Sequence, residues 1–147
     1  ELRSSRQASV ELAGGAAVLQ VEVMDELGQL LALCGGVLSV CEMSSLQSKG
    51  EIPGAKGATC FSVGAHGHRS MVCVGVGTSI HVFEFSVSAF ERIASVQVSS
   101  APHALLIKGG SIFASLSGGY AMVQEGYAKA EELMPPPPNA KAEEFLP

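Results

Sequence analysis

Residues 71–85 read MVCVGVGTSIHVFEF, and this stretch contains the pattern on which most of the chain is built. Two short apolar runs, 71–76 and 80–85, are separated by Gly77. Short runs rich in β-branched residues are typical of buried strands, and a glycine between them supplies the positive φ angle of a tight turn. The stretch therefore predicts a buried β-hairpin.

The same pattern occurs twice more along the chain. The runs that flank the other two turns are residues 30–34 and 37–43 in the first copy, and residues 112–116 and 120–123 in the third. The turn glycines Gly36, Gly77 and Gly118 stand 41 residues apart each time. Four-stranded propeller blades repeat every ~40–45 residues. This interval predicts three blades of a propeller.

Each repeat is predicted to hold four strands in up-and-down order. The predicted strands are residues 18–24, 30–34, 37–43 and 46–52 in the first unit, 58–63, 71–76, 80–85 and 90–98 in the second, and 103–107, 111–116, 119–124 and 127–134 in the third. The last segment is equally compatible with a helical turn, because alanine and glutamate are frequent in it. The predicted fold class is all-β, a partial β-propeller of about three four-stranded antiparallel blades of a WD-repeat-like ring.

The predicted organisation assigns residues 1–17 to the end of a preceding blade or a connection, and residues 18–134 to the three blades. Residues 135–147 begin with four prolines and are predicted to connect to the next blade, because such a run is extended and lacks N–H donors. The alternative for the proline run is a ligand for an aromatic-lined recognition domain. Closed propellers have roughly four to eight blades, so we expect the chain to be a fragment of a larger one.

Composition argues against several classes of function. The net charge is −5 and the nine basic residues are scattered, whereas a surface that follows phosphates needs clustered Lys and Arg, so no nucleic-acid partner is expected. No apolar run approaches the roughly 18–20 residues that cross a bilayer. The first residues are polar with no apolar run behind them, so no signal peptide is expected, and both ends of the chain look cut.

Four cysteines lie inside apolar runs: Cys34, Cys41, Cys60 and Cys73. None forms a C-x-x-C pair, and cysteine in such runs behaves as a small buried hydrophobe. We therefore expect four reduced thiols. The alternative is a disulfide between Cys34 and Cys41, which lie on the two arms of one predicted hairpin.

Two short motifs have residue types that are found in binding sites. Gly75-Val76-Gly77 lacks the third glycine and the helix of a dinucleotide fingerprint, so a hairpin turn is predicted there. His66 and His68 form an H-x-H in a predicted polar loop, 64–69, but zinc takes three or four protein ligands and no further ligand is placed nearby. The role of the two histidines stays open, with a solvated loop favoured.

The remaining polar residues match no catalytic pattern. No G-x-S-x-G sequence surrounds a serine, and the acidic pairs Asp25-Glu26, Glu131-Glu132 and Glu143-Glu144 are expected in solvated turns and edges. No catalytic, cofactor-binding or metal-binding residue is predicted, no cofactor is expected, and the chain is predicted not to be an enzyme. An enzyme built on a propeller would need clustered acids, histidines or metal ligands on its first strands, which offer almost none.

Several segments resemble the citron homology (CNH) domain. They read LLALCGGVLSVCEMSSL (residues 30–46), KGATCFSV (56–63), MVCVGVGTSIHVFEF (71–85), APHALLIKGGSIFASLSGGYAMV (101–123) and ELMP (132–135). The resemblance is greatest to the N-terminal propeller of vacuolar protein sorting tether subunits of HOPS and CORVET, the TGF-beta-receptor-associated-protein-like group. In that group a leucine-rich strand, a glycine turn and a return strand precede a Lys-Gly entry to the next blade, here Lys56-Gly57.

The resemblance implies a non-catalytic interaction propeller of a vesicle-tethering subunit that acts in endosome and vacuole (lysosome) fusion. Its implied partners are a Rab-type small GTPase and other tether subunits, with peripheral membrane association and no small-molecule substrate. The implied location is cytoplasmic, on endosomal or vacuolar membranes. The alternative is the regulatory CNH domain of a germinal-centre-type protein kinase or a Rho guanine-nucleotide exchange factor. Loop tips 64–70 and 99–102 are generic candidates for partner contact.

Overall fold

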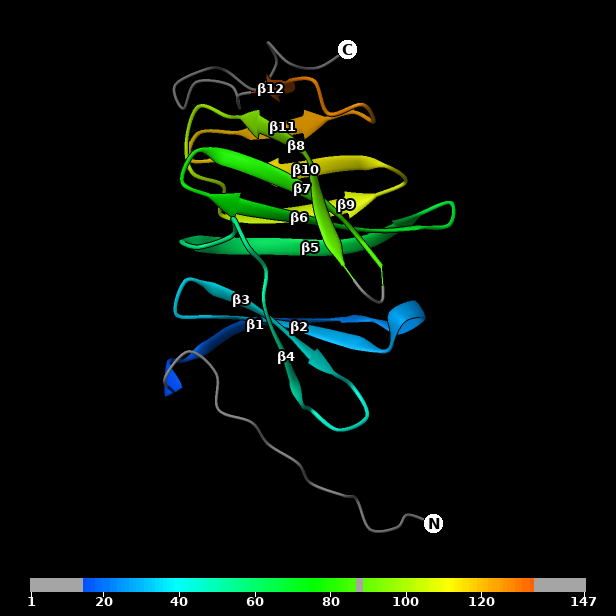
Figure 1. The fold of residues 1–147 in the computed structure, drawn as a ribbon. Helices are drawn as coiled ribbons and strands as arrows, with labels where there is room; N and C mark the ends of the chain where they lie inside the picture. Colours follow the sequence, from blue (N-terminus) through cyan, green and yellow to red (C-terminus); the bar gives the residue numbers. More distant parts are fainter. Residues whose placement is uncertain (1–14, 87–88, 134–147) are drawn as a thin grey trace, which may run out of the picture.

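A computed structural model of the chain describes residues 15–86 and 89–133, which form three four-stranded sheets (Figure 1). The first sheet holds β1 (Val18–Met24), β2 (Gln29–Cys34), β3 (Val37–Glu42) and β4 (Ser48–Glu51), with the 3-10 turn η2 (Asp25–Leu27) between β1 and β2. The second holds β5 (Ala58–His66), β6 (Arg69–Val76), β7 (Ser79–Phe85) and β8 (Phe90–Gln97). The third holds β9 (Ala104–Lys108), β10 (Ser111–Ser115), β11 (Tyr120–Val123) and β12 (Ala130–Leu133).

In each sheet the strands follow chain order, and every neighbouring pair is antiparallel. The sheets stack face to face, with the second sheet between the other two (Figure 1). The first strands of consecutive sheets contact each other, β1 with β5 and β5 with β9. Stacked up-and-down sheets with their first strands adjacent are the blades of a β-propeller, so the predicted fold class is confirmed. Three blades make part of a ring.

Two apolar seams hold the sheets together. The first seam, between the first and second sheets, includes Leu31, Leu33, Leu38, Val40, Phe61, Val72, Val74 and Phe83. The second seam, between the second and third sheets, includes Met71, Cys73, Ile80, Val82, Ile107, Ile112, Ala121 and Val123. Both sides of β6 are buried because its side chains alternate between the two seams.

Side chains on the first strands bond to the backbone of the next sheet. The Gln20 amide donates to the carbonyl oxygen of Phe61 at 2.6 Å and accepts from the Phe61 N–H at 3.3 Å. One sheet further on, the N–H of Ile107 donates to the Ser62 hydroxyl at 3.1 Å. The innermost edges of β5 and β9 have no neighbouring strand in their own sheets, so these bonds satisfy backbone groups there.

The turn between β5 and β6 corrects the expected polar loop at 64–69. The antiparallel ladder runs on until His66 pairs with Arg69, which leaves only Gly67 and His68 in the turn. Backbone hydrogen bonding determines where β5 ends, and such bonding does not require apolar side chains. Gly67 has φ +65°, which an L side chain rarely adopts.

The third repeat differs in detail from the prediction. Its last strand is confirmed but shorter, Ala130–Leu133, and the helical-turn alternative is wrong because this segment pairs with β11. The glycines expected to turn left-handed do so at Gly36 and Gly77, with φ +72° and +58°. Gly118 does not have a positive φ, because four residues instead of two connect β10 to β11 and no tight hairpin turn is needed.

The expectations for the ends of the chain remain predictions. Residues 1–14 and 134–147, which include the proline run and most of the two predicted connections, lie outside the described residues.

Candidate partner-binding site

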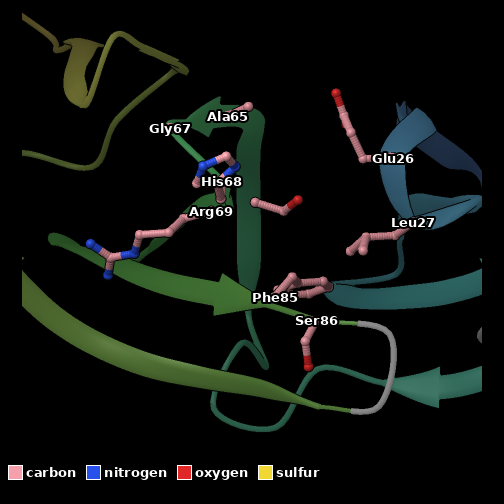
Figure 2. Close-up of a pocket in the computed structure, with 9 residues that line it drawn as sticks. Glu26, Leu27, Ala65, Gly67, His68, Arg69, Phe85 and Ser86 are labelled. Atoms are coloured by element: carbon pink, nitrogen blue, oxygen red, sulfur yellow. The ribbon is translucent and has the colours of Figure 1, made fainter.

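A pocket of about 410 Å³ opens where the first seam reaches one end of the sheets (Figure 2). Glu26 and Leu27 of η2 form one wall. The second sheet supplies the rest of the lining, namely Ala65, Gly67, His68, Arg69, Ser70, Phe85 and Ser86. The volume lies within the roughly 300–1,000 Å³ of ligand pockets. We call it the seam pocket.

The pocket exists because side chains become smaller along the first seam. On β5 the residues facing the first sheet change from Phe61 through Val63 to Ala65, and on β6 from Val72 to Ser70. Large side chains fill the middle of the seam, whereas alanine and serine leave space at its end. The sequence of the two strands therefore sets the position and size of the pocket.

Charged side chains lie on both sides of the pocket, and they differ in whether they have a partner. The Arg69 guanidinium bonds to the Glu84 carboxylate at 2.9 Å. This hydrogen bond raises the pKa of Arg69 and lowers the pKa of Glu84, so both groups stay ionised around neutral pH. Arg69 belongs to the β6 face that carries Met71 and Cys73, and Figure 2 shows its side chain extending away from Glu26 and Leu27.

Glu26 has a different environment. It lies on a turn at the rim, and among the described residues none forms an ion pair or hydrogen bond with its carboxylate. The Ser70 hydroxyl likewise has no hydrogen-bond partner in the described part of the chain, although Ser70 is only 8% exposed. The seam pocket thus offers an unpaired carboxylate and a buried hydroxyl above an apolar floor, with the His68 imidazole also in its lining.

The H-x-H histidines are separated by the structure. His66 lies at the end of β5, where its Nε2 is 2.7 Å from the Glu125 carboxylate of the third sheet's last connection. Its ring also contacts Gly110, where an added Cβ would lie 3.1 Å from the ring. His68 lines the seam pocket instead. In residues 15–86 and 89–133 no three His, Cys, Asp or Glu side chains gather in a way that could hold a metal ion.

The other two histidines do not line the pocket. The Nδ1 of His81 is 2.9 Å from the Ser95 hydroxyl on β8, and burial lowers the pKa of His81, with Arg92 adding to this. His103 lies in the connection to β9, where its N–H donates to the Ser115 carbonyl at 2.8 Å.

All four cysteines are buried and none of them forms a disulfide, so the expected arrangement is confirmed and the Cys34–Cys41 disulfide alternative is wrong. In the β2–β3 hairpin Cys34 is opposite Val37 and Cys41 is opposite Leu30, which puts the two thiols at opposite ends of the hairpin. Burial raises the pKa of Cys73 to about 12. A thiol held in its protonated form is a poor nucleophile.

The glycine motif is a hairpin turn, as predicted. Gly75 is opposite Ile80 in the β6–β7 ladder, and Gly77 makes the turn. Gly75 allows close packing at this position, because an added Cβ would lie 2.9 Å from the Cys60 Sγ atom.

A second, apolar hollow of about 350 Å³ lies on the outer face of the third sheet. The large apolar side chains exposed in it are Leu106, Phe113 and Tyr120. The equivalent faces of the first two sheets are covered by the sheet that follows in sequence. This position identifies the hollow as a blade-packing face rather than a separate binding site.

Of the two generic loop candidates, only one lines the seam pocket. Residues 65 and 67–70 of the first tip do so. In the second, Ser99 bonds through its N–H and hydroxyl to Glu132 of the third sheet, at 2.8 and 2.5 Å. Sequence reasoning missed Glu26, Leu27 and Phe85. The decrease from phenylalanine and valine to alanine and serine along alternate positions was the signal that could have located the pocket.

Comparison with protein families identifies a match over almost the whole chain. A family model described as the CNH domain matches residues 2–145. A search of curated protein sequences finds no match. No helix in the described part of the chain is long and apolar enough to span a membrane.

Solved structures share the fold at low identity. The AfRom2 CNH domain superposes with a TM-score of 0.65 at 17% identity, covering 80% of this chain and 41% of that one. The β-propeller domain of Myceliophteria thermophila Cps50 (Swd1) gives 0.63 at 12% identity, covering 89% and 43%. Kuenenia stuttgartiensis hydrazine synthase gives 0.59 at 14% identity, covering 71% and 32%. The chain spans about a third to two fifths of each of these structures, one of which is an enzyme.

Proposed function

The chain belongs to the CNH domain family, and from this we propose that it is part of the protein-binding propeller of a vesicle-tethering subunit. Its family is one of interaction propellers, which present rigid faces and loops to protein partners. The resemblance of residues 56–63 and 118–123 to HOPS and CORVET subunits supports this choice of parent. The proposed partners are a Rab-type small GTPase and the other tether subunits.

The observation that carries the binding role is the seam pocket. It lies at the end of two sheets whose ladders hold it in shape, and its polar groups, Glu26 and Ser70, are left available by their neighbours. Such a concave site on rigid strands suits a partner's side chain. Burial raises the pKa values of Cys41, Cys60 and Cys73, which is the opposite of an activated nucleophile. We therefore propose binding without catalysis.

The proposed location follows from the proposed parent. A tethering subunit acts on the cytoplasmic side of endosomal and vacuolar or lysosomal membranes, held there by its partners and by peripheral contact.

A second candidate is the regulatory CNH domain of a germinal-centre-type kinase or a Rho exchange factor. The structural similarity to the AfRom2 CNH domain supports this second candidate, because it extends over 80% of the chain. At 17% identity it establishes the shared fold and leaves the parent open.

A capture experiment separates the two candidates. The complete protein that contains this chain is immobilised and exposed to a panel of Rab and Rho GTPases, each loaded with GTP or GDP. The tether proposal expects GTP-dependent capture of at least one Rab protein. Capture of a Rho protein, with no Rab bound, would overturn it and favour the second candidate.

A further inference from the structure

We propose that the seam pocket binds a basic side chain, arginine or lysine, from a partner protein. This inference rests on the proposed role as a protein-binding propeller and adds the chemistry of one contact. Three features of the pocket favour a basic ligand, namely its shape, the charge at its rim and the buried hydroxyl within it.

The shape suits a long aliphatic stem. Phe85 forms the floor and is fixed there, since its ring stacks on Phe90 with centroids 4.9 Å apart. Leu27 and Ala65 form the apolar sides. Arginine and lysine bury their methylene groups along such surfaces while keeping the charged head near polar groups. A short acidic side chain would leave the apolar floor uncovered.

The charge at the rim determines whether the pocket favours a positively or a negatively charged ligand. Glu26 has no partner among the described residues, and Asp25 precedes it in the same turn. The Arg69 guanidinium is bound to the Glu84 carboxylate, and its side chain extends away from Glu26 and Leu27 (Figure 2). His68 is the other titratable side chain of the lining. Among the carboxylates and guanidinium groups that line the pocket, only the Glu26 carboxylate has no partner in the described part of the chain, and it complements a cation.

The Ser70 hydroxyl provides a second polar contact. Ser70 follows Val72 and Val74 on the face of β6 that points into the first seam, and it is 8% exposed. A buried polar group without a partner costs free energy, so a ligand donor that reaches this oxygen is favoured. Guanidinium and ammonium groups carry only donors, and a hydroxyl oxygen accepts them.

The test measures the binding of short peptides to the complete protein. The probes are the capped pentapeptide Gly-Ser-X-Ser-Gly with X as arginine, lysine, citrulline, glutamate or phosphoserine, titrated to millimolar concentration. Citrulline has the shape of arginine without its charge. We expect arginine or lysine peptides to bind, and citrulline, glutamate and phosphoserine peptides to bind at least roughly five-fold more weakly, as for a loss of about 1 kcal/mol.

Variants locate the binding to the pocket. Glu26→Gln is expected to weaken the arginine and lysine peptides roughly five-fold. Ser70→Val fills the space and removes the acceptor, so it should abolish saturable binding. The matched controls are Glu91→Gln and Ser111→Val, on β8 and β10 outside the pocket lining, and these should bind as the unmodified protein does.

Three results would overturn the inference. They are equal binding of the citrulline peptide, preferential binding of the phosphoserine peptide, and no loss of binding in Glu26→Gln. The same preparation is tested for GTPase capture. Capture without peptide binding rejects the pocket inference and leaves the proposed function standing, whereas peptide binding without any GTPase capture rejects the proposed partner and leaves the pocket assignment standing.

Discussion

Gly75 is a residue at which one added carbon atom would press into the packing between two sheets. A Cβ at this position would lie 2.9 Å from the Cys60 Sγ atom and 3.6 Å from both Leu105 and Pro102. We expect Gly75→Ala to lower the free energy of unfolding of the complete propeller by about 1–3 kcal/mol, because the neighbours must move. Urea unfolding measures this loss.

A double-mutant cycle identifies the atom responsible. Cys60→Ala removes the sulfur that the new methyl group would meet, so Gly75→Ala should be less harmful in a Cys60→Ala background than alone. Additive losses in the double variant would show that some other contact limits the site.

Cys73 gives the chain a predictable response to alkaline pH. Burial raises its pKa from an ordinary 9.0 to about 12, so the folded state holds this proton where the unfolded chain releases it. The stabilisation is complete below pH 9 and is lost as pH rises from about 9 to about 12, by at most about 1.4 kcal/mol per pH unit. Urea unfolding at pH 8, 9 and 10 checks the slope.

The comparison variant for this slope is Cys73→Ala. Tyrosines and lysines also titrate in this range, so the prediction concerns the difference between the two proteins. Cys73→Ala should be less stable at pH 8, because it leaves a cavity, and should lose less stability between pH 9 and 10. Parallel pH curves for the two proteins would contradict the prediction.

At the scale of the strand, Gln20 links β1 to the edge of β5 that has no neighbouring strand in its own sheet. Its side chain both donates to and accepts from the backbone of Phe61, as a neighbouring strand would. We expect Gln20→Ala to cost about 1–2 kcal/mol, because two backbone groups lose their partners. Faster hydrogen exchange at the Phe61 amide is the direct measurement.

Glu22, two residues further along the same face of β1, provides the control. It accepts from Gln20 but bonds to no backbone group of the second sheet among the described residues. Glu22→Ala should therefore leave exchange at the Phe61 amide unchanged. Equal acceleration in both variants would indicate a general loosening of β1.

The sequence predicted the elements best where side-chain pattern and turn chemistry agree. The hairpins at Gly36 and Gly77 follow from apolar runs that meet at a glycine, and both glycines have the expected positive φ. The end of β5 was missed because its ladder is made by backbone groups, which carry no sequence signal there. The seam pocket was missed for a related reason, since Glu26 and Ser70 are brought together by the stacking of two sheets.

At the scale of the whole molecule, the outer face of the third sheet is expected to be buried against a further sheet. Leu106 is 53% exposed on this face, whereas the equivalent faces of the first two sheets are covered by the following sheet. In a complete propeller a further sheet covers it. We therefore expect Leu106→Asp to destabilise the complete domain by about 2–3 kcal/mol, the value of burying a leucine.

A second exposed apolar residue tests whether this effect is specific. Ile93 is 36% exposed, but it lies on β8, the outer edge of the second sheet. Ile93→Asp should cost less than about 1 kcal/mol, the span of strand propensities. Melting curves of the two variants decide the matter, and equal losses would mean that the third sheet is not covered.

The stacking of each sheet on its predecessor has a consequence for synthesis on the ribosome. The large contacts between sheets in the described part of the chain join β1 and β2 to β5, and β5 and β6 to β9, so each sheet packs on the one translated just before it. A nascent chain can therefore complete one seam after another as it emerges, without waiting for distant segments. Only the closure of the ring depends on the last strand to leave the exit tunnel.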